Sequence, residues 1–319
     1  MTDEVRQRPG SLETDDPIED GKRRRALSPV LGLDEFRPLS SAVKVEFSAK
    51  SHPGRVRPNN EDHYLILRLD RSQEVLETSL PEADFLRRFD EHSYAMLIAD
   101  GIGGTGTGAV ASRVALSTLA HLAMHYGRWN VRVDGRTAAE IIERAEWYYR
   151  RVNEAVVERA KENPLLAGMA TTMTATYSAG DDLFLAHVGH SRAYIFRDGE
   201  LTQLTSDHTV ANRLAQSAPR PFPVDRATED LKHILTDTIG GGSGKPMVQA
   251  AHFRIWDGDR VLLCTDGLIS QVGDDRIAEV LTLQRRLDEQ CQMLIDLALE
   301  HGGPDNITVV LAQYRVPRG

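Results

Sequence analysis

The stretch YAMLIADGIGGTGTGAVAS, residues 94–112, decides the fold, because three different patterns follow one another in it without a break. Residues 94–99 are an apolar run that predicts a buried strand ending at Asp100. A glycine-rich turn follows over residues 101–108, and residues 109–126 then have the pattern of a helix. A carboxylate at the end of a buried strand is costly unless a partner or a metal ion compensates its charge. Asp100 is therefore the first candidate site residue.

The same arrangement recurs elsewhere in the chain. Asp266 follows the apolar run RVLLCT and precedes a glycine, while Asp305 lies just before the run ITVVLAQY. A fourth acidic pair, Glu61-Asp62, precedes the run HYLILRL. A single Asp-Gly is usually only a turn, but three carboxylates beside strongly apolar runs suggest that the strand ends converge. A set of oxygen ligands suits Mg²⁺ or Mn²⁺ better than Zn²⁺.

The remaining patterns predict an α+β fold. Several strand-like runs lie close together, and Asp198-Gly199 is a hairpin signal between two of them. Apolar residues at helical spacing predict long helices over 137–162 and about 275–300, the second stopped by Gly302-Gly303-Pro304. Strands grouped by hairpins, with a few long helices inserted, indicate antiparallel sheets that pack together and are covered by helices.

Composition and charge limit the classes of protein to which the chain can belong. The chain has 319 residues, 38 basic and 47 acidic, and a formal net charge of −9, which argues against broad nucleic-acid binding. Residues 1–40 are predicted to be a disordered charged tail, and residues 41–319 one domain. Neither an apolar run long enough to span a membrane nor a secretory signal is present, so we expect a cytoplasmic protein. Cys264 and Cys291 lie in apolar segments and are predicted to be reduced.

Two features have competing interpretations. Gly101, Gly103 and Gly106 match the G-x-G-x-x-G pattern of dinucleotide-binding proteins, so an NAD-type oxidoreductase is one hypothesis. The acidic residue expected about 20 positions later is absent, which argues against it. Arg57 could grip a phosphate beside the carboxylates, or it could form a surface ion pair with Glu61.

Six motifs occur in one order, and together they resemble the metal-dependent protein serine/threonine phosphatases of the protein phosphatase 2C family, particularly its bacterial members. The motifs are RPNNED, IADGIGGTGTGAVAS, MATTMTATY, HVGHSRAYIFRDGELTQLTSDHT, LLCTDGLI and GGPDNITVVL. The resemblance spans about residues 45–315. It implies a four-layer α/β/β/α sandwich of two antiparallel sheets flanked by helices, with a centre for two Mg²⁺ or Mn²⁺ ions at one end.

The resemblance also implies roles for individual residues. Asp100 would bridge two metal ions, and the Gly101 carbonyl would bind one of them. Asp266 and Asp305 would complete the other ion's ligands, and Glu61 would bind a metal directly or through water. Asp62 and Asn306 would support these ligands, and Arg57 would hold the substrate phosphate. The loop at about 210–235 would be a variable flap beside the site.

The chain departs from the family pattern at several positions. His190 stands where family members usually have an Asp that helps to hold a third metal ion. It could bind metal, donate a proton to the leaving group, or do neither. Thr105 and Ala109 replace residues common in bacterial relatives, and no obvious general acid is visible. The leading hypothesis is hydrolysis of phosphoserine and phosphothreonine in proteins, with a serine/threonine kinase or its targets as possible partners. The alternative is a catalytically weak phosphoprotein-binding or regulatory module.

Overall fold

The computed structural model describes residues 42–81, 87–103, 106–127, 133, 135–217, 231–242 and 244–317. The predicted tail, residues 1–40, lies outside them. Contacts divide the chain into a small unit, Met1–Arg37 with Ser72–Phe89, and a large unit, Pro38–Arg71 with Asp90–Gly319. In the small unit, the backbone N–H of Val75 donates a 2.9 Å hydrogen bond to the carbonyl oxygen of Arg87. The covering helices, the candidate site and most of each central sheet lie in the large unit.

Two five-stranded sheets form the centre of the fold. The first contains, in spatial order, β1 (Lys44–His52), β13 (Ile307–Arg315), β12 (Arg260–Cys264), β8 (Arg192–Arg197) and β9 (Glu200–Gln203). The second contains β11 (Gln249–Arg254), β7 (Asp182–Val188), β6 (Met173–Ala179), β3 (Arg88–Ala99) and β2 (His63–Glu74). Pairing is antiparallel, with Leu262 opposite Leu311 in the first sheet and Ala175 opposite Ala186 in the second.

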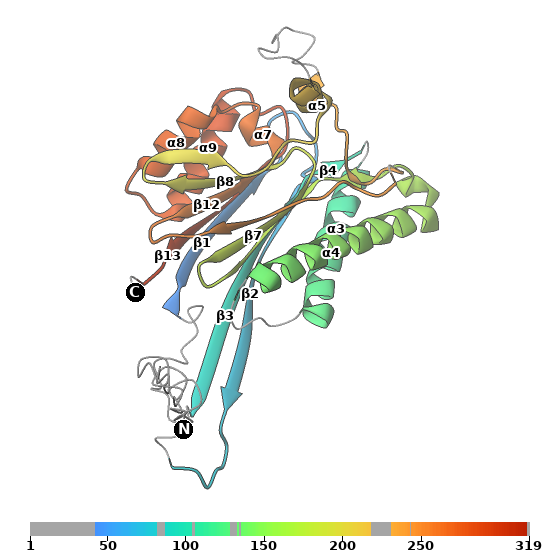
Figure 1. The fold of residues 1–319 in the computed structure, drawn as a ribbon. Coiled ribbons are helices and arrows are strands. Elements are labelled where there is room, and N and C mark those ends of the chain that lie inside the picture. The colour runs from blue at the N-terminus through green and yellow to red at the C-terminus, as the bar shows by residue number, and fades with distance from the viewer. Residues whose placement is uncertain are drawn as a thin grey trace, which may run out of the picture. The chain divides into compact units, whose positions relative to one another are not determined.

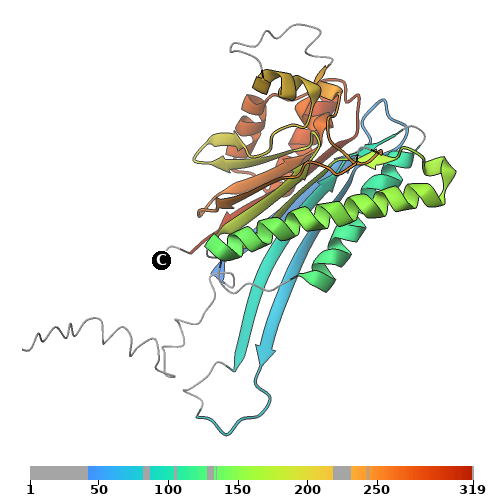
Figure 2. The ribbon, with the colours of Figure 1, turned by 45° about the vertical axis from the view of Figure 1, so that its right-hand side comes forward.

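Helices cover the outer face of each sheet, as Figures 1 and 2 show. Helices α8 (Asp274–Thr282) and α9 (Leu287–Glu300) lie on the first sheet. Helices α3 (Thr107–Tyr126) and α4 (Gly135–Glu162) lie on the second. The predicted four-layer sandwich of two antiparallel sheets between helices is therefore confirmed.

Apolar clusters on both sides of each sheet explain why the central strands are apolar on both faces. Along β12, Leu262 faces α8 and α9, whereas Leu263 faces the other sheet. Along β3, Leu97 faces α3 and α4, whereas Ile98 faces the space between the sheets. Successive side chains of a strand point to opposite faces, so a strand buried on both faces reads as a continuous apolar run.

The predicted helix over 275–300 is wrong in one respect, because the structure has two helices there. Leu283 is extended (φ −63°, ψ 137°), and the chain turns before α9 begins at Leu287. The buried side-chain amide of Gln290 donates to the carbonyl oxygens of Val280, Leu281 and Leu283 at 2.8–3.4 Å. These bonds satisfy carbonyls that the end of α8 leaves free, which periodicity alone does not reveal.

Other local predictions are confirmed. Asp198 (φ 52°) and Gly199 (φ 87°) form the turn between β8 and β9. Helix α9 ends before Gly302 and Gly303, both with positive φ, and the N–H of Gly303 donates to the carbonyl oxygen of Ala298. Both cysteines are free and buried. In the described part of the chain, every helix is too short or too polar to cross a membrane.

Candidate metal centre

A cavity of about 470 Å³ lies where the ends of strands from both sheets meet. Its lining includes eight of the candidate residues: Arg57, Glu61, Asp100, Gly101, His190, Asp266, Asp305 and Asn306. A small sheet helps to build one wall. It consists of β10 (Ile239–Gly240), β5 (Ala170–Thr171) and β4 (Gly101–Ile102), in that order. Pairing of Gly101 with Thr171 holds the glycine turn against the strand ends.

Asp100 and Asp266 face each other across this cavity with His190 beside them. One potential ligand atom from each of the three residues lies within 4.8 Å of the others. The His190 Nδ1 is 3.8 Å from Asp100 Oδ2, and its Nε2 is 3.5 Å from Asp266 Oδ2. Asp100 is held through its backbone, since its carbonyl oxygen accepts a 2.7 Å hydrogen bond from the Thr171 hydroxyl. The carboxylate of Asp100 is thereby left to face the cavity.

Asp305 joins the cluster from the start of β13. Arg57 Nη2 donates a 2.7 Å hydrogen bond to Asp305 Oδ2, and the Arg57 side chain is 55% exposed. Asn306 ties together the segments that carry these residues. Its side-chain oxygen accepts from the N–H of Glu61 (2.8 Å), and its amide donates to the carbonyls of Pro53 and Asn59. The ion pair that Arg57 forms in this structure is with Asp305 and not with Glu61.

Asp62 does not line the cavity but is buried behind it. Its Oδ2 accepts hydrogen bonds from the hydroxyls of Thr265 (2.8 Å) and Thr308 (2.7 Å). Its Oδ1 is buried and has no hydrogen-bond partner among the residues that the structure describes. Burial, opposed by the two threonine bonds, raises the pKa of Asp62 to about 7 from 3.8. A buried carboxylate oxygen without a partner is costly, so its surroundings are incomplete without a cation or a proton.

Two glycines allow close packing beside Glu61. A Cβ atom at Gly108, in the first turn of α3, would overlap Oε2 of Glu61. A Cβ atom at Gly101 would overlap the backbone of Gly108 and lie 2.7 Å from the carbonyl oxygen of Glu61. The glycine turn thus brings the start of α3 against the acidic segment, a role that differs from the dinucleotide pattern considered above.

The cluster carries more negative charge than its described partners neutralise. Burial raises the pKa of Asp100 well above its ordinary value, and the charges of Asp62, Asp266 and Asp305 raise it further. Burial also raises the pKa of Glu61, against the opposing effect of Arg57. Carboxylate and carbonyl oxygens crowded in this way are the donor set that Mg²⁺ and Mn²⁺ prefer. The residues present therefore fit divalent cations.

Sequence reasoning missed the hydroxyl groups that support the carboxylates. Thr171 and Thr172 bond to the backbone of Asp100, and Thr265 and Thr308 bond to Asp62. The sequence did contain a signal for these supporting groups, namely a threonine beside the end of an apolar strand. This signal is weak, because threonine is common in strands. His233 and Leu235 of the predicted flap also line the cavity, whereas residues 218–230 of that flap and Thr105 lie outside the described residues.

Comparison with known proteins identifies the family of the chain. A family model described as protein phosphatase 2C matches residues 73–299. The serine/threonine protein phosphatase PstP of Mycobacterium tuberculosis is 34% identical over 269 residues, which cover 84% of this chain but 45% of that protein. The chain thus spans about half the length of that relative. The serine/threonine phosphatase stp of Listeria monocytogenes is 30% identical over 260 residues, covering 82% of this chain and 92% of that protein.

Solved structures show the same fold. The crystal structure of the M. tuberculosis phosphatase PstP/Ppp superposes with a TM-score of 0.66 at 32% identity, covering 84% of this chain and 98% of that one. The PstP catalytic domain in complex with two manganese ions gives a TM-score of 0.63 at 32% identity, covering 86% and 99%.

Proposed function

The chain belongs to the protein phosphatase 2C family, and from this membership and its acidic cavity we propose that it hydrolyses phosphoserine and phosphothreonine in proteins. One observation carries the proposal: Asp100, Asp266 and Asp305, far apart in sequence, line one cavity with Arg57 at its exposed side. Such a cavity can hold cations, a phosphate group and water together. Metal-dependent hydrolysis of a phosphate ester requires the cations, the phosphate group and the water in one place.

The proposed metal ligands are Asp100, the carbonyl of Gly101, Glu61, Asp266 and Asp305. Two Mg²⁺ or Mn²⁺ ions held there would supply a hydroxide near neutral pH by lowering the pKa of a water that bridges them. The relative with two manganese ions supports this number of ions. Asp62 would not bind a metal ion itself. Its hydrogen bonds with Thr265 and Thr308 would hold in place the segment that carries Glu61. Asn306 would fix the position of Asp305 and of the backbone at Glu61.

Arg57 is proposed to hold the phosphate. Its guanidinium pairs with Asp305, but its exposure leaves it free to turn toward a ligand in the cavity. A guanidinium offers two parallel N–H donors to phosphate oxygens, which both orients the group and compensates its charge. A cation bound to Asp305 would compensate the charge of this carboxylate and so weaken its attraction for the Arg57 guanidinium. Arg57 can then exchange the carboxylate for the phosphate.

Hydrolysis joins a water oxygen to phosphorus and breaks the bond from phosphorus to the serine or threonine oxygen, which then takes up a proton. Two imidazoles, His190 and His233, line the cavity and are candidate donors of that proton. Burial leaves Cys264 and Cys291 without a role here, because it raises their thiol pKa values to about 12 and about 11.

The position of His190 supports a second candidate function, a phosphoprotein-binding module with weak catalysis. Its ring lies beside Asp100 and Asp266, where a carboxylate would add an oxygen ligand. An opposing kinase is a further prediction that rests on the family alone. A cytoplasmic setting is a prediction from the sequence, which lacks a membrane-spanning run and a secretory signal.

Phosphate release from a phosphothreonine peptide, with Mn²⁺ and with a chelator, tests the proposal. The Asp266→Asn variant should lose nearly all Mn²⁺-dependent release. The matched variant Asp275→Asn, at an exposed position on α8, should keep it. Equal activity in Asp266→Asn and wild-type protein would reject the metal-centre mechanism. Peptide binding without release in the wild-type protein would favour the binding module.

A further inference from the structure

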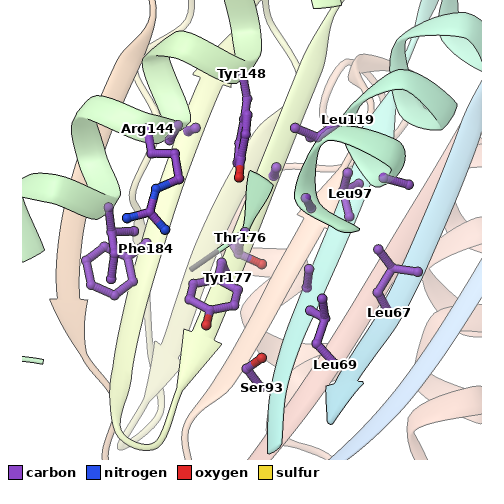
Figure 3. A pocket seen from close by; sticks show the side chains of 18 of the residues that line it. Leu67, Leu69, Ser93, Leu97, Leu119, Arg144, Tyr148, Thr176, Tyr177 and Phe184 are labelled. Carbon is purple, nitrogen blue, oxygen red and sulfur yellow. The ribbon is translucent and has the colours of Figure 1, made fainter. Parts of the chain in front are cut away.

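A second cavity, of about 440 Å³, lies between helices α3 and α4 and the sheet strands β2, β3, β6 and β7 that they cover. Figure 3 looks into it. It shares no lining residue with the acidic cavity. Pockets that bind small organic molecules are usually about 300–1,000 Å³. The cavity is therefore large enough for a small ligand.

Short side chains create this space. Alanines occupy facing positions on the helices and the sheet, including Ala120, Ala123, Ala145 and Ala175. Leu67, Leu97 and Leu119 form an apolar wall on one side (Figure 3). The cavity is partly open to solvent, since its lining includes the exposed side chains of Met124 and Arg68. Its walls favour an apolar ligand body.

Two polar side chains of α4 point into this apolar space, Arg144 and Tyr148 (Figure 3). The Tyr148 hydroxyl is buried and has no hydrogen-bond partner in the described part of the chain. Burial raises the pKa of Tyr148, and the nearby charge of Arg144 opposes that shift. A buried donor that makes no bond costs free energy unless something in the cavity accepts it.

Arg144 provides a positive charge in this cavity. No carboxylate of the described residues forms an ion pair with it. Arg68, which also lines the cavity, pairs with Asp70 at 2.7 Å. Asp70 also lies 2.6 Å from His92. Asp70, the one carboxylate among the described lining residues, is thus already engaged, and the guanidinium of Arg144 gives the cavity a positive end.

We propose that this cavity binds a small amphiphilic carboxylate. The apolar body of the ligand lies against the leucines and alanines, and its carboxylate pairs with Arg144 and accepts a hydrogen bond from Tyr148. A guanidinium and a carboxylate match in charge and geometry, and such bonds are stronger in surroundings that exclude water. The same ligand satisfies both unpartnered groups.

Isothermal titration calorimetry of the full chain with sodium decanoate tests the proposal, and decan-1-ol serves as the uncharged match. Decanoate should bind one molecule per chain, about tenfold more tightly than decanol, as expected for a charge-assisted hydrogen bond. Arg144→Met should weaken decanoate about tenfold and leave decanol unchanged. Arg150→Met, on the same helix but exposed and outside the cavity, should behave like wild type.

Two further variants separate binding from folding. Tyr148→Phe should weaken decanoate severalfold without lowering Tm, because the hydroxyl it removes bonds to nothing in the described protein. Ala120→Phe should fill the cavity and abolish binding of both probes. No binding of decanoate to wild-type protein would overturn the proposal. Equal affinity in wild type and Arg144→Met would overturn it as well.

Discussion

The imidazole of His190 lies beside two carboxylates, with Nδ1 3.8 Å from Asp100 Oδ2 and Nε2 3.5 Å from Asp266 Oδ2. Its Nδ1 has no hydrogen-bond partner in the described part of the chain. A ring in this position lies against two of the three aspartates of the proposed metal centre. The identity of residue 190 should therefore set how that centre binds cations.

The His190→Asp variant tests this relationship. An aspartate adds an oxygen ligand and a negative charge, so the Mn²⁺ concentration for half-maximal phosphate release should fall severalfold. The proposal predicts a shift in the ratio of Mg²⁺- to Mn²⁺-supported rates as well. His190→Asn is the control, because it changes size similarly without adding charge. Unchanged metal dependence in His190→Asp would refute an influence of residue 190 on the metals.

Gly108→Ala should weaken metal binding through Glu61. The added Cβ would overlap Glu61 Oε2 and the backbone of Gly101, so one of them must move. We expect a loss of about 10–100-fold in Mn²⁺ affinity, the usual effect of disturbing the support of a metal ligand. Gly135→Ala is the control, because a Cβ there meets open space. Calorimetry that gives the same Mn²⁺ affinity for Gly108→Ala and wild type would contradict this.

Thr308→Val should destabilise the fold. The substitution keeps the shape of the side chain but removes a 2.7 Å hydrogen bond to the buried Asp62. Leaving a buried carboxylate less satisfied costs about 1–3 kcal/mol. Unfolding by denaturant measures this loss as a change in the free energy of unfolding. Thr282→Val serves for comparison, since that hydroxyl donates to the Ala278 carbonyl on an exposed helix surface and supports no buried carboxylate among the described residues. Equal losses in the two variants would show that Asp62 does not depend on Thr308.

The metal-free protein should become less stable as pH rises. Folding raises the pKa of Asp62 from 3.8 to about 7, chiefly by burial, so the folded state binds more protons than the unfolded state between these values. The associated stability is fully present below about pH 4 and is lost as pH rises through about 7. In chelator, Tm should fall between about pH 5 and about pH 8. Added Mn²⁺ should restore it at the higher pH.

The Asp62→Asn variant shows whether that pH dependence comes from the carboxyl group. It cannot ionise, so its Tm in chelator should vary less across the same pH range. A metal-free wild-type Tm that is constant or rises between about pH 5 and about pH 8 would contradict the assignment.

The strand ends were predictable from sequence, and the supporting contacts were not. Asp100 and Asp266 each end an apolar run, so their position at a sheet end follows from local pattern. The break between α8 and α9 depends on Gln290, which reaches back across the turn to bond carbonyls of the preceding helix. The hollow beside Arg144 arises where two helices and a sheet meet. Contacts of this kind depend on individual side chains and on how elements pack together, and periodicity contains no information about them.

The most direct test of the metal-centre account is a titration of metal-free protein with Mn²⁺ in which bound ions and phosphate release from a phosphothreonine peptide are measured together. The account predicts no release without metal, and release that appears as the second ion binds. Release from the metal-free protein would contradict it. Two bound ions without any release would contradict catalysis and leave the binding module as the better description.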